Sequence, residues 1–273
     1  MNSLKDKVVL ITGASSGIGE ALAIEAASRG AKLMLAARNT EKLSHLTTKL
    51  KAKGIEAYFT KTDVSQEADC KHLIDETLKK FHKIDVLIND AGISMRAVFN
   101  EVDLAVIKQL MDTNFWGTVY CTKYALPHLL QQKGTVSSVS SVAGLKGLPG
   151  RTGYSASKFA ILGFMESLRI ENLHTGLHVL MAFPGFTASN IRNTALAADG
   201  SQQGESPRDE AKMMSAEEVA RRIINAIEKR KRTILMTNQG KFAVYFNKFW
   251  PALTDRLIYN HMANEPDSPF SKK

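Results

Sequence analysis

Short aliphatic runs alternate with amphipathic helical patterns along most of this chain. Runs that lack polar alternation are typical of strands buried on both faces of a parallel sheet. The predicted strands are 7–12, 32–36, 56–60, 85–88, 134–139, 177–183 and 233–236. Helical spacing of apolar residues follows at 40–53 and 103–127 and in the segments beginning near Gly17, Tyr154 and Ser215. This alternation predicts an α/β domain with a mostly parallel sheet and helices on both faces.

A glycine-rich turn follows the first predicted strand and precedes the first helix. Gly13, Gly17 and Gly19 have GxxxGxG spacing. Ser15, Ser16 and Ile18 are further candidate site residues between these glycines. Glycines let the backbone approach a pyrophosphate, and a helix N-terminus supplies unpaired N–H groups. The order therefore predicts a dinucleotide site, with a plain strand-to-helix turn as the alternative; a Walker loop is excluded because the sequence contains no Gly-Lys-Ser/Thr.

The end of the second predicted strand, Ala36-Ala37-Arg38-Asn39, bears on the type of cofactor. In NAD binders an acidic residue here holds the ribose 2′-hydroxyl, whereas an arginine accommodates a 2′-phosphate. Arg38 favours NADP(H) over NAD(H), with a solvated loop arginine as the alternative. Asp63 and Val64 follow the third strand, and Ser65 is the expected cap of the next helix. The Asp63 carboxylate either accepts from an adenine amine or only shapes the turn.

Tyr154 and Lys158 lie four residues apart, so on a helix their side chains address the same small volume. A nearby cation favours the phenolate and brings a phenol toward useful acid–base chemistry, although an ordinary surface pair has the same spacing. Ser141 follows the C-terminal end of the strand 134–139 and precedes Tyr154 by thirteen residues. Asn114 continues the apolar stripe of the helix 103–127, where a buried amide must find partners.

Two further strand ends carry small residues that permit close approach of a ligand or backbone. Asn89-Asp90-Ala91-Gly92 follows the fourth strand, and Pro184-Gly185-Phe186-Thr187 follows the sixth. The polar segment 186–214 is too long for a simple connection and is predicted to be a substrate lid.

The segment 241–273 carries an aromatic stripe, Phe242, Tyr245, Phe246 and Phe249, before a helix break at Trp250-Pro251. We expect this extension to pack on its own domain or on a partner subunit. The alternative is a membrane-surface helix or an entrance for lipid-like substrates.

Composition limits the other possibilities. A length of 273 residues with 44% hydrophobic and 23% charged residues fits one sizeable domain, and the formal charge of +9 suits acidic or phosphorylated ligands. The basic cluster 229–232 lies at a predicted helix end, which favours a dipole interaction over a nucleic-acid site. Two cysteines and scattered histidines predict no metal site. No apolar run is long enough to span a bilayer, and we expect a cytoplasmic protein, with membrane association as an alternative.

Taken together, these motifs resemble the single-domain short-chain dehydrogenase/reductase family over roughly 5–235, with hydroxysteroid dehydrogenases and related "dehydrogenase/reductase" members as the nearest in appearance. The resemblance implies a Rossmann-like, doubly wound, seven-stranded sheet, a catalytic domain over 1–240 and a homodimer or homotetramer. The chain departs from the family's usual Asn-Asn-Ala-Gly at Asp90, which puts the side-chain contacts there in doubt.

The resemblance also implies a chemistry: reduction of a ketone or aldehyde, or the reverse, on a small-molecule substrate. Ser141 would polarise the carbonyl, Tyr154 would transfer the proton, Lys158 would lower the tyrosine pKa, and Asn114 would position a water. The implied cofactor-binding residues are Gly13, Ser15, Ser16, Gly17, Ile18, Gly19, Arg38, Asp63, Val64, Asn89, Asp90, Ala91, Gly92, Tyr154, Lys158, Pro184, Gly185 and Thr187. The alternatives are a non-catalytic dinucleotide sensor or scaffold and an epimerase or dehydratase, for which the chain is short.

Overall fold

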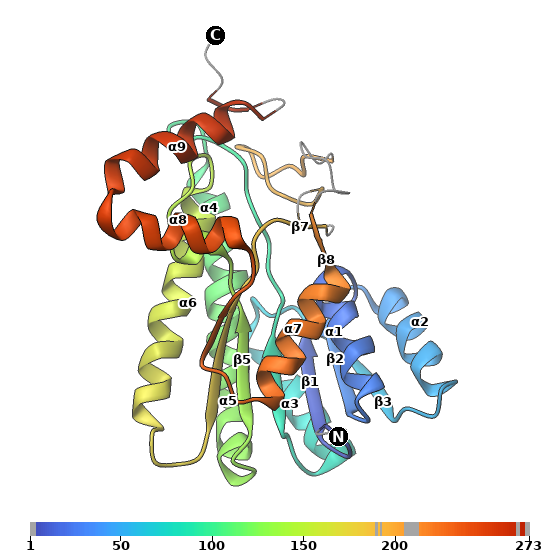
Figure 1. Ribbon diagram of the computed structural model, residues 1–273. Helices are drawn as coiled ribbons and strands as arrows, with labels where there is room; N and C mark the ends of the chain where they lie inside the picture. The colour runs from blue at the N-terminus through green and yellow to red at the C-terminus, as the bar shows by residue number, and fades with distance from the viewer. Residues whose placement is uncertain (1–3, 189–190, 192, 205–212, 266–267, 271–273) are drawn as a thin grey trace.

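A seven-stranded parallel sheet forms the centre of the computed structural model, which describes residues 4–188, 191, 193–204, 213–265 and 268–270 (Figure 1). The strands run side by side in the order β3, β2, β1, β4, β5, β6, β9, and each neighbouring pair is parallel. Their bounds are β1 Val8–Thr12, β2 Lys32–Ala37, β3 Ala57–Lys61, β4 Val86–Asn89, β5 Thr135–Val139, β6 His178–Phe183 and β9 Thr233–Leu235. The sequence-based prediction of a seven-stranded, doubly wound sheet is confirmed.

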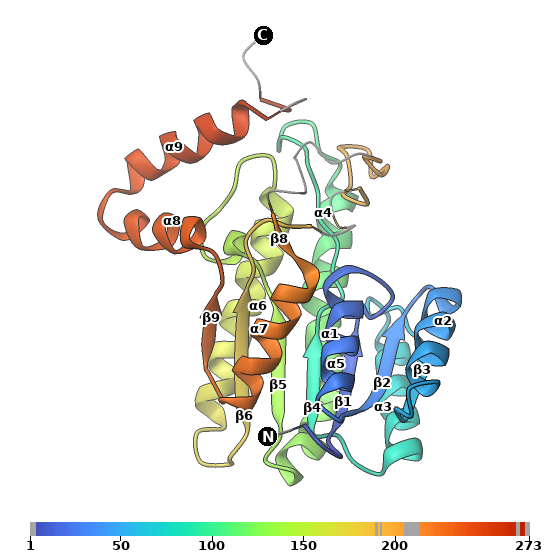
Figure 2. The ribbon, with the colours of Figure 1, turned by 45° about the vertical axis from the view of Figure 1, so that its right-hand side comes forward.

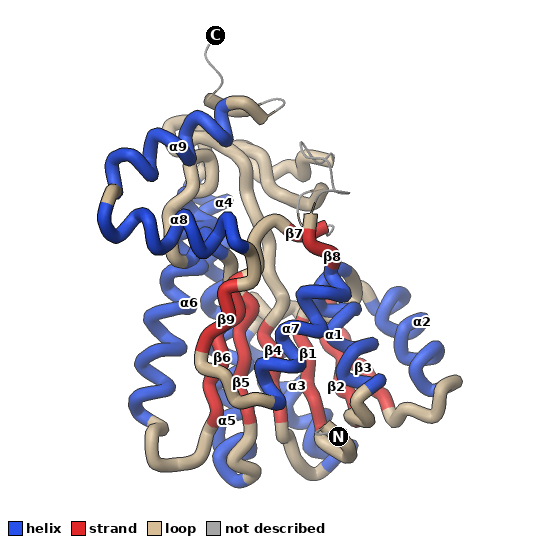
Figure 3. Tube along the Cα trace, in the orientation of Figure 1, coloured by secondary structure: helices blue, strands red, loops and turns tan. Residues whose placement is uncertain are grey.

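Helices cover both faces of this sheet (Figure 3). One face carries α1 Gly17–Ser28, α2 Thr40–Lys51 and α7 Ala216–Glu228. The other carries α3 Glu67–Phe81, α5 Gly117–Gln131 and α6 Thr152–Glu171. The aliphatic strands form because every residue of β1, β5 and β6 is buried between these two layers, where apolar side chains are removed from water.

The strand order reverses between β1 and β4, because β1 pairs with β2 on one side and with β4 on the other. Helices therefore leave the sheet in opposite directions at this point and open a crevice at the carboxyl ends of the strands. The loops after β1, β4, β5 and β6 all meet there.

The helix predicted over 103–127 is a continuous helical run with a change of hydrogen-bond register in the middle. It consists of α4 Leu104–Leu110, a π-helical segment Met111–Trp116 and α5. Apolar spacing did not reveal the register change, because the stripe of Ile107, Leu110 and Met111 lies before this segment or at its first residue. Asn114 lies inside the π-helical segment, a feature that is frequent at functional sites.

Side-chain caps fix the start of one helix and correct a prediction at another. The Ser215 side chain accepts from the Glu218 amide and caps α7. Ser65, however, does not cap α3; the cap residue is Gln66, and the Ser65 hydroxyl instead donates to Asp63 Oδ1 at 2.8 Å. The Asp63 carboxylate draws Ser65 into a turn, which places the helix start one residue later.

The C-terminal segment forms a helical hairpin, α8 Asn238–Phe249 and α9 Pro251–Ala263, separated at the predicted Trp250-Pro251 break. Figures 1 and 2 show this hairpin beyond the carboxyl ends of β5 and β6, above α6 and on the same side of the molecule as the crevice. None of the described helices is long and apolar enough to cross a membrane.

Candidate active site

A cavity of about 750 Å³ occupies the crevice at the carboxyl ends of the strands. Its walls come from the loops after β1, β2, β3, β4, β5 and β6, from the N-terminal half of α6 and from the α8–α9 hairpin. Most of the predicted site residues therefore converge. Those in the wall are Gly13, Ser15, Ser16, Gly17, Ile18, Arg38, Asp63, Val64, Asp90, Ala91, Gly92, Ser141, Tyr154, Lys158, Pro184, Gly185 and Thr187.

The glycine turn is shaped as a close-approach cradle. Gly13 and Gly17 have φ of 73° and 59°, a region that favours glycine. A Cβ on Gly13 would lie 2.8 Å from backbone atoms of Ala91, and one on Gly19 would overlap the Gly13 carbonyl. The turn ends in the N-terminus of α1, whose cap residue Ser16 makes no side-chain hydrogen bond to the helix. The N-terminus of α1 and the absence of side chains at the glycines fit a diphosphate at this point.

The far end of the cavity has a cation and no acid at the end of β2. Arg38 lines the cavity, and the neighbouring Asn39 side chain caps α2 by accepting from the Lys42 amide. Asp63 also lines the cavity while accepting from the Ser65 amide at 3.1 Å. Asp63 therefore shapes the turn, and its predicted contact with an adenine amine stays a prediction.

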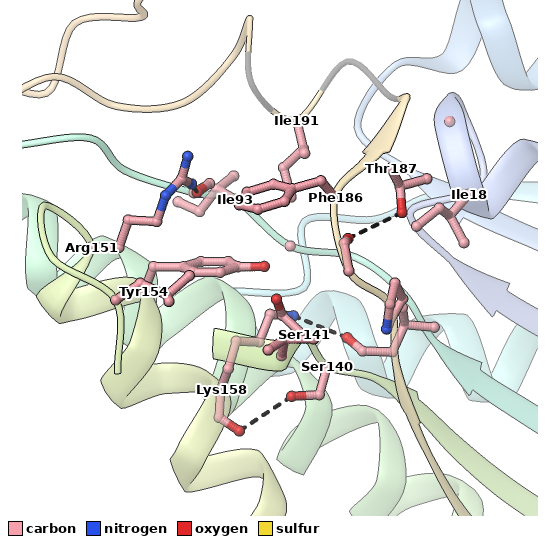
Figure 4. A pocket seen from close by; sticks show the side chains of 18 of the residues that line it. Ile18, Ile93, Ser140, Ser141, Arg151, Tyr154, Lys158, Phe186, Thr187 and Ile191 are labelled. Atoms are coloured by element: carbon pink, nitrogen blue, oxygen red, sulfur yellow. Dashed lines mark hydrogen bonds between the residues drawn. The ribbon is translucent and has the colours of Figure 1, made fainter. Parts of the chain in front are cut away.

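Ser141, Tyr154 and Lys158 meet in the middle of the cavity (Figure 4). Ser141 caps a short 3-10 helix, Val142–Gly144, by accepting from the Ala143 amide at 3.2 Å, and its hydroxyl is near enough to Tyr154 to lower the pKa of the phenol. Lys158 Nζ donates to the Val139 carbonyl at 3.0 Å and lies 5.8 Å from the centroid of the Tyr154 ring. Both helical side chains are buried, at 8% and 4% exposure. The geometry expected from the four-residue spacing is present.

The pKa of Tyr154 does not follow the expectation that the Lys158 charge lowers it. Burial raises the pKa of the phenol, and the charge of Asp90 raises it further, while the nearby Ser141 hydroxyl and the charge of Arg151 lower it. The net shift is upward, opposite to the one inferred from Lys158 alone. The sequence could not supply this result, because burial and the Asp90 and Arg151 charges depend on the folded cavity.

Lys158 and Asp90 form an interacting pair of opposite charges. Burial lowers the pKa of Lys158 to about 8, partly offset by the Asp90 charge. Burial raises the pKa of Asp90 to about 7, partly offset by the Lys158 charge and by the Gly19 backbone N–H. Both groups thus titrate near neutral pH, which is unusual for either side chain.

Three predicted site residues lie behind the wall rather than in it. Asn114 Oδ1 accepts from the Ile93 amide at 2.8 Å, and its Nδ2 donates to the Ile93 carbonyl at 3.0 Å and to Ser157 Oγ at 2.9 Å. Asn89 Nδ2 donates to Thr122 Oγ1 at 3.1 Å, and Gly19 packs against Gly13. These residues shape the loops that carry the cavity-lining groups.

Asn114 nevertheless lies next to Lys158. A Cβ on Gly92 would be 3.1 Å from Asn114 Oδ1 and 3.5 Å from Lys158 Nζ, so both polar groups approach the same bare stretch of backbone. The π-helical register directs Asn114 toward this point.

The substrate side of the cavity contains residues that the sequence did not single out. Arg151 is buried beside Tyr154, and its Nη1 donates to Ser94 Oγ at 2.8 Å. The described part of the predicted lid contributes Phe186, Ile191, Thr194 and Leu196, and Leu196 pairs with Met95. The hairpin contributes an apolar wall of Phe242, Phe246, Leu257, Ile258 and Met262. Neither Arg151, which precedes α6, nor these lid residues carried a sequence signal that marked them as part of the cavity wall.

The prediction of a lid over 186–214 is only partly visible, since 189–190, 192 and 205–212 lie outside the described residues. Among the described residues, no group of histidine, cysteine, aspartate and glutamate is arranged to hold a metal ion.

Comparison with known proteins gives a consistent assignment. Residues 7–199 match the family model described as short chain dehydrogenase. The 11-beta-hydroxysteroid dehydrogenase 1A of Arabidopsis thaliana is 35% identical over 94% of this chain and 76% of its own length. The mouse dehydrogenase/reductase SDR family member 7B is 33% identical over 98% of this chain and 85% of its own. A Burkholderia phymatum short-chain dehydrogenase/reductase, solved in complex with NAD, superposes with a TM-score of 0.83 at 26% identity, covering 93% of this chain and 96% of that one.

Proposed function

This chain belongs to the short-chain dehydrogenase/reductase family, and we propose that it is an NADP(H)-dependent oxidoreductase that interconverts a ketone or aldehyde and its alcohol. The observation that carries the proposal is the meeting of Ser141, Tyr154 and Lys158 in the same cavity as the glycine cradle. A protein that only binds a dinucleotide has no need of a serine hydroxyl and a phenol that line the cavity together at that point.

Each residue has a distinct task in the proposed reaction. The Ser141 hydroxyl holds the substrate oxygen, and the Tyr154 phenol gives that oxygen a proton in reduction or removes one in oxidation. Lys158 would hold the ribose of a bound cofactor, and Asn114, which lies behind the cavity wall near the Gly92 backbone, would position the water that links Lys158 to solvent. A bound nicotinamide dinucleotide would supply or accept the hydride. The residues therefore provide orientation and proton transfer.

The preference for NADP(H) rests on Arg38 and on the lack of an acid at the end of β2. A guanidinium there pairs with a 2′-phosphate, whereas NAD(H) offers only a hydroxyl. The Burkholderia neighbour was solved with NAD, so the two cofactors must be compared directly. We expect wild type to bind NADPH more tightly than NADH and Arg38→Ala to lose most of that difference. If wild type binds NADPH and NADH with equal affinity, the proposed preference for NADP(H) is wrong.

A hydrophobic or lipid-like substrate fits this cavity, because Phe186 and Ile191 of the lid lie across from Tyr154 (Figure 4) and the hairpin adds further apolar lining. The relatives named hydroxysteroid dehydrogenases are consistent with a bulky apolar substrate. The exposed face of the hairpin, with Phe242, Tyr245, Phe249 and Trp250 each at least 56% exposed, provides contact with a membrane or a partner subunit. We further propose that the protein is cytoplasmic and a homo-oligomer.

The catalytic claim is tested by following NADPH oxidation with a panel containing decanal, cyclohexanone and a ketosteroid. Wild type should turn over at least one of these, and Tyr154→Phe should reduce kcat by about 10²-fold or more while retaining NADPH binding, because it removes only the proton donor. Indistinguishable wild type and variant would favour the non-catalytic sensor or scaffold.

A further inference from the structure

Lys146 brings a positive charge to the substrate side of the cavity. It lies on the loop between the 3-10 helix Val142–Gly144 and α6, and its amide donates to the Val142 carbonyl at 3.0 Å. This turn therefore leads from Ser141, which caps the 3-10 helix, to Lys146. The Lys146 side chain lines the cavity and is only 15% exposed. An ammonium group in such a place requires an anionic or polar partner.

The partner of Lys146 in the structure is a surface carboxylate. Lys146 Nζ lies 2.5 Å from Oδ1 of Asp255 on α9, and the Asp255 side chain is 65% exposed. Lys146 lines the cavity, whereas Asp255 does not. An ion pair whose acid remains in water contributes little to stability, because water competes for the exposed carboxylate. Exchanging Asp255 for an anion inside the cavity therefore costs little.

The walls near Lys146 contain no competing carboxylate in the part of the chain that the structure describes. The carboxylates that line the cavity are Asp63 and Asp90, which follow β3 and β4 beside the proposed dinucleotide site. Arg151 and His261 also line the cavity. The apolar lining from the hairpin consists of Phe242, Phe246, Leu257, Ile258 and Met262. An anion on an apolar molecule therefore meets apolar surface and a cation on this side.

We propose that Lys146 binds an anionic group of the substrate, so that the preferred substrate is an apolar carbonyl compound or alcohol that also carries a carboxylate. The inference rests on the proposed oxidoreductase function and names the substrate class of the same cavity. The reacting group lies at Ser141 and Tyr154, the apolar body lies against the hairpin, and the carboxylate replaces Asp255 at Lys146. A charge-assisted hydrogen bond is stronger in a cavity with little water than at the surface.

The test uses ω-oxo acids with chains of six, eight, ten and twelve carbons, each compared with its own methyl ester. The two compounds of a pair have the same reacting aldehyde and the same chain, and only the acid is charged. We expect wild type to show at least about tenfold higher kcat/KM for the acid at the best chain length, mainly through a lower KM. Lys146→Gln should abolish this preference, and Lys146→Arg should keep most of it.

Asp255→Asn separates substrate binding from a structural role. This variant breaks the same ion pair but leaves Lys146 in place, so it should keep or increase the preference for the acid. A lysine that only ties α9 to the loop after Ser141 predicts the same result for Lys146→Gln and Asp255→Asn. The control for overall charge is Lys108→Gln, which removes a 77% exposed cation on α4 and should leave the preference unchanged.

A second measurement does not require turnover. Isothermal titration calorimetry compares the binding of decanoate and 1-decanol to the NADPH-bound protein. Wild type should bind decanoate more tightly than 1-decanol, and Lys146→Gln should bind the two alike, because only decanoate carries a charge for Lys146 to bind. Thermal unfolding of each variant shows that it is folded.

Equal kcat/KM for acid and ester at every chain length in wild type would overturn the proposal, as would a preference for the acid that survives in Lys146→Gln. The same effect of Lys146→Gln and Asp255→Asn would also overturn it. If none of the oxo compounds is turned over, equal affinity of wild type for decanoate and 1-decanol decides against the proposal. None of these results affects the oxidoreductase function itself, which fails only if wild type turns over no carbonyl probe in a manner that depends on Tyr154.

Discussion

Asp90 places an ionisable carboxyl group beside Lys158, where an asparagine would carry no charge. Its backbone N–H is held by Thr12 Oγ1 at 3.2 Å, so the loop keeps a fixed shape. The departure at Asp90 therefore changes the electrostatics of the cavity more than its geometry. Burial outweighs the attraction of Lys158 and holds the pKa of Asp90 at about 7.

This pKa predicts a pH-dependent stability. Because the folded-state value of about 7 lies above the ordinary 3.8, folding takes up a proton at Asp90, and the associated stability is lost as pH rises through that window. Relative to Asp90→Asn, wild type should lose up to about 1.4 kcal/mol per pH unit there, and less to the extent that water enters the cavity. Urea unfolding at a series of pH values measures the difference.

Asp85→Asn is the matched control. The Val8 amide and the side chains of Lys7 and Lys83 outweigh burial and lower the pKa of Asp85. The stabilisation that Asp85 provides is present above its ordinary pKa of 3.8 and is lost only at lower pH. The stability difference between wild type and Asp85→Asn should therefore not change with pH between 3.8 and about 7. If the stability difference between wild type and Asp90→Asn also does not change with pH over this window, Asp90 has an ordinary pKa in the folded protein.

Residue-level prediction from the sequence succeeded where the topology fixes the position. Ser141 lies just beyond the carboxyl end of β5 and Tyr154 lies in the first turn of α6, so their placement at the carboxyl edge follows from the fold class. Arg151 and the net pKa of Tyr154 depend on burial and on charges from distant loops, which no local spacing encodes.

At the scale of elements, the glycine turn and the N-terminus of α1 form the proposed dinucleotide site, because the glycines there have no side chains that would block the approach of a diphosphate. Gly19→Ala would place a Cβ against the Gly13 carbonyl and beside the Asp90 carboxylate. We expect at least a tenfold weaker NADPH affinity, or about 1.4 kcal/mol, measured by fluorescence titration. The backbone shift should also destabilise the fold by about 1–3 kcal/mol.

Gly163→Ala provides the control for that substitution. Gly163 is exposed in the interior of α6, and an added Cβ would meet nothing within 4 Å. Alanine there should stabilise the protein by about 0.5–1 kcal/mol through helix propensity and leave NADPH affinity unchanged. Equal NADPH affinity in both variants would remove the argument for close backbone approach at Gly19.

The sequence predicted the central strands and helices to within a few residues, because burial on both faces leaves uninterrupted aliphatic runs. The π-helical segment around Asn114 was not predicted, since the stripe Ile107, Leu110 and Met111 reads the same in either register. Only the backbone geometry reveals that Asn114 is directed at Ile93 and Ser157.

At the scale of the whole molecule, the hairpin α8–α9 has two faces. Phe246 and Met262 line the cavity, whereas Phe249 and Trp250 are 73% and 56% exposed. The aromatic stripe predicted a packed or membrane-bound helix without deciding between them, because spacing alone does not show what surrounds a helix. Packing on its own domain is present, and the outer face remains available for a membrane or a partner subunit.

Phe249→Asp tests the outer face without touching the cavity wall. We expect it to reduce co-sedimentation with liposomes containing anionic lipid several-fold, since it removes apolar area and adds a charge that anionic lipid repels. The control is Lys108→Gln, which removes an exposed positive charge on α4, outside the hairpin, and should not change liposome binding. If wild type does not co-sediment, the membrane proposal fails; a Phe249→Asp protein of smaller oligomeric state would instead assign the face to a partner subunit.

The central claim is that this cavity brings a carbonyl carbon, the Tyr154 phenol and a nicotinamide together. The most direct measurement uses NADPH deuterated at the transferred position of nicotinamide C4 and mass spectrometry of the alcohol formed from an active carbonyl probe. The account predicts one deuterium in the product with wild type and at least about 10²-fold less product with Tyr154→Phe. Product without deuterium, or equal labelled product from both proteins, would contradict it.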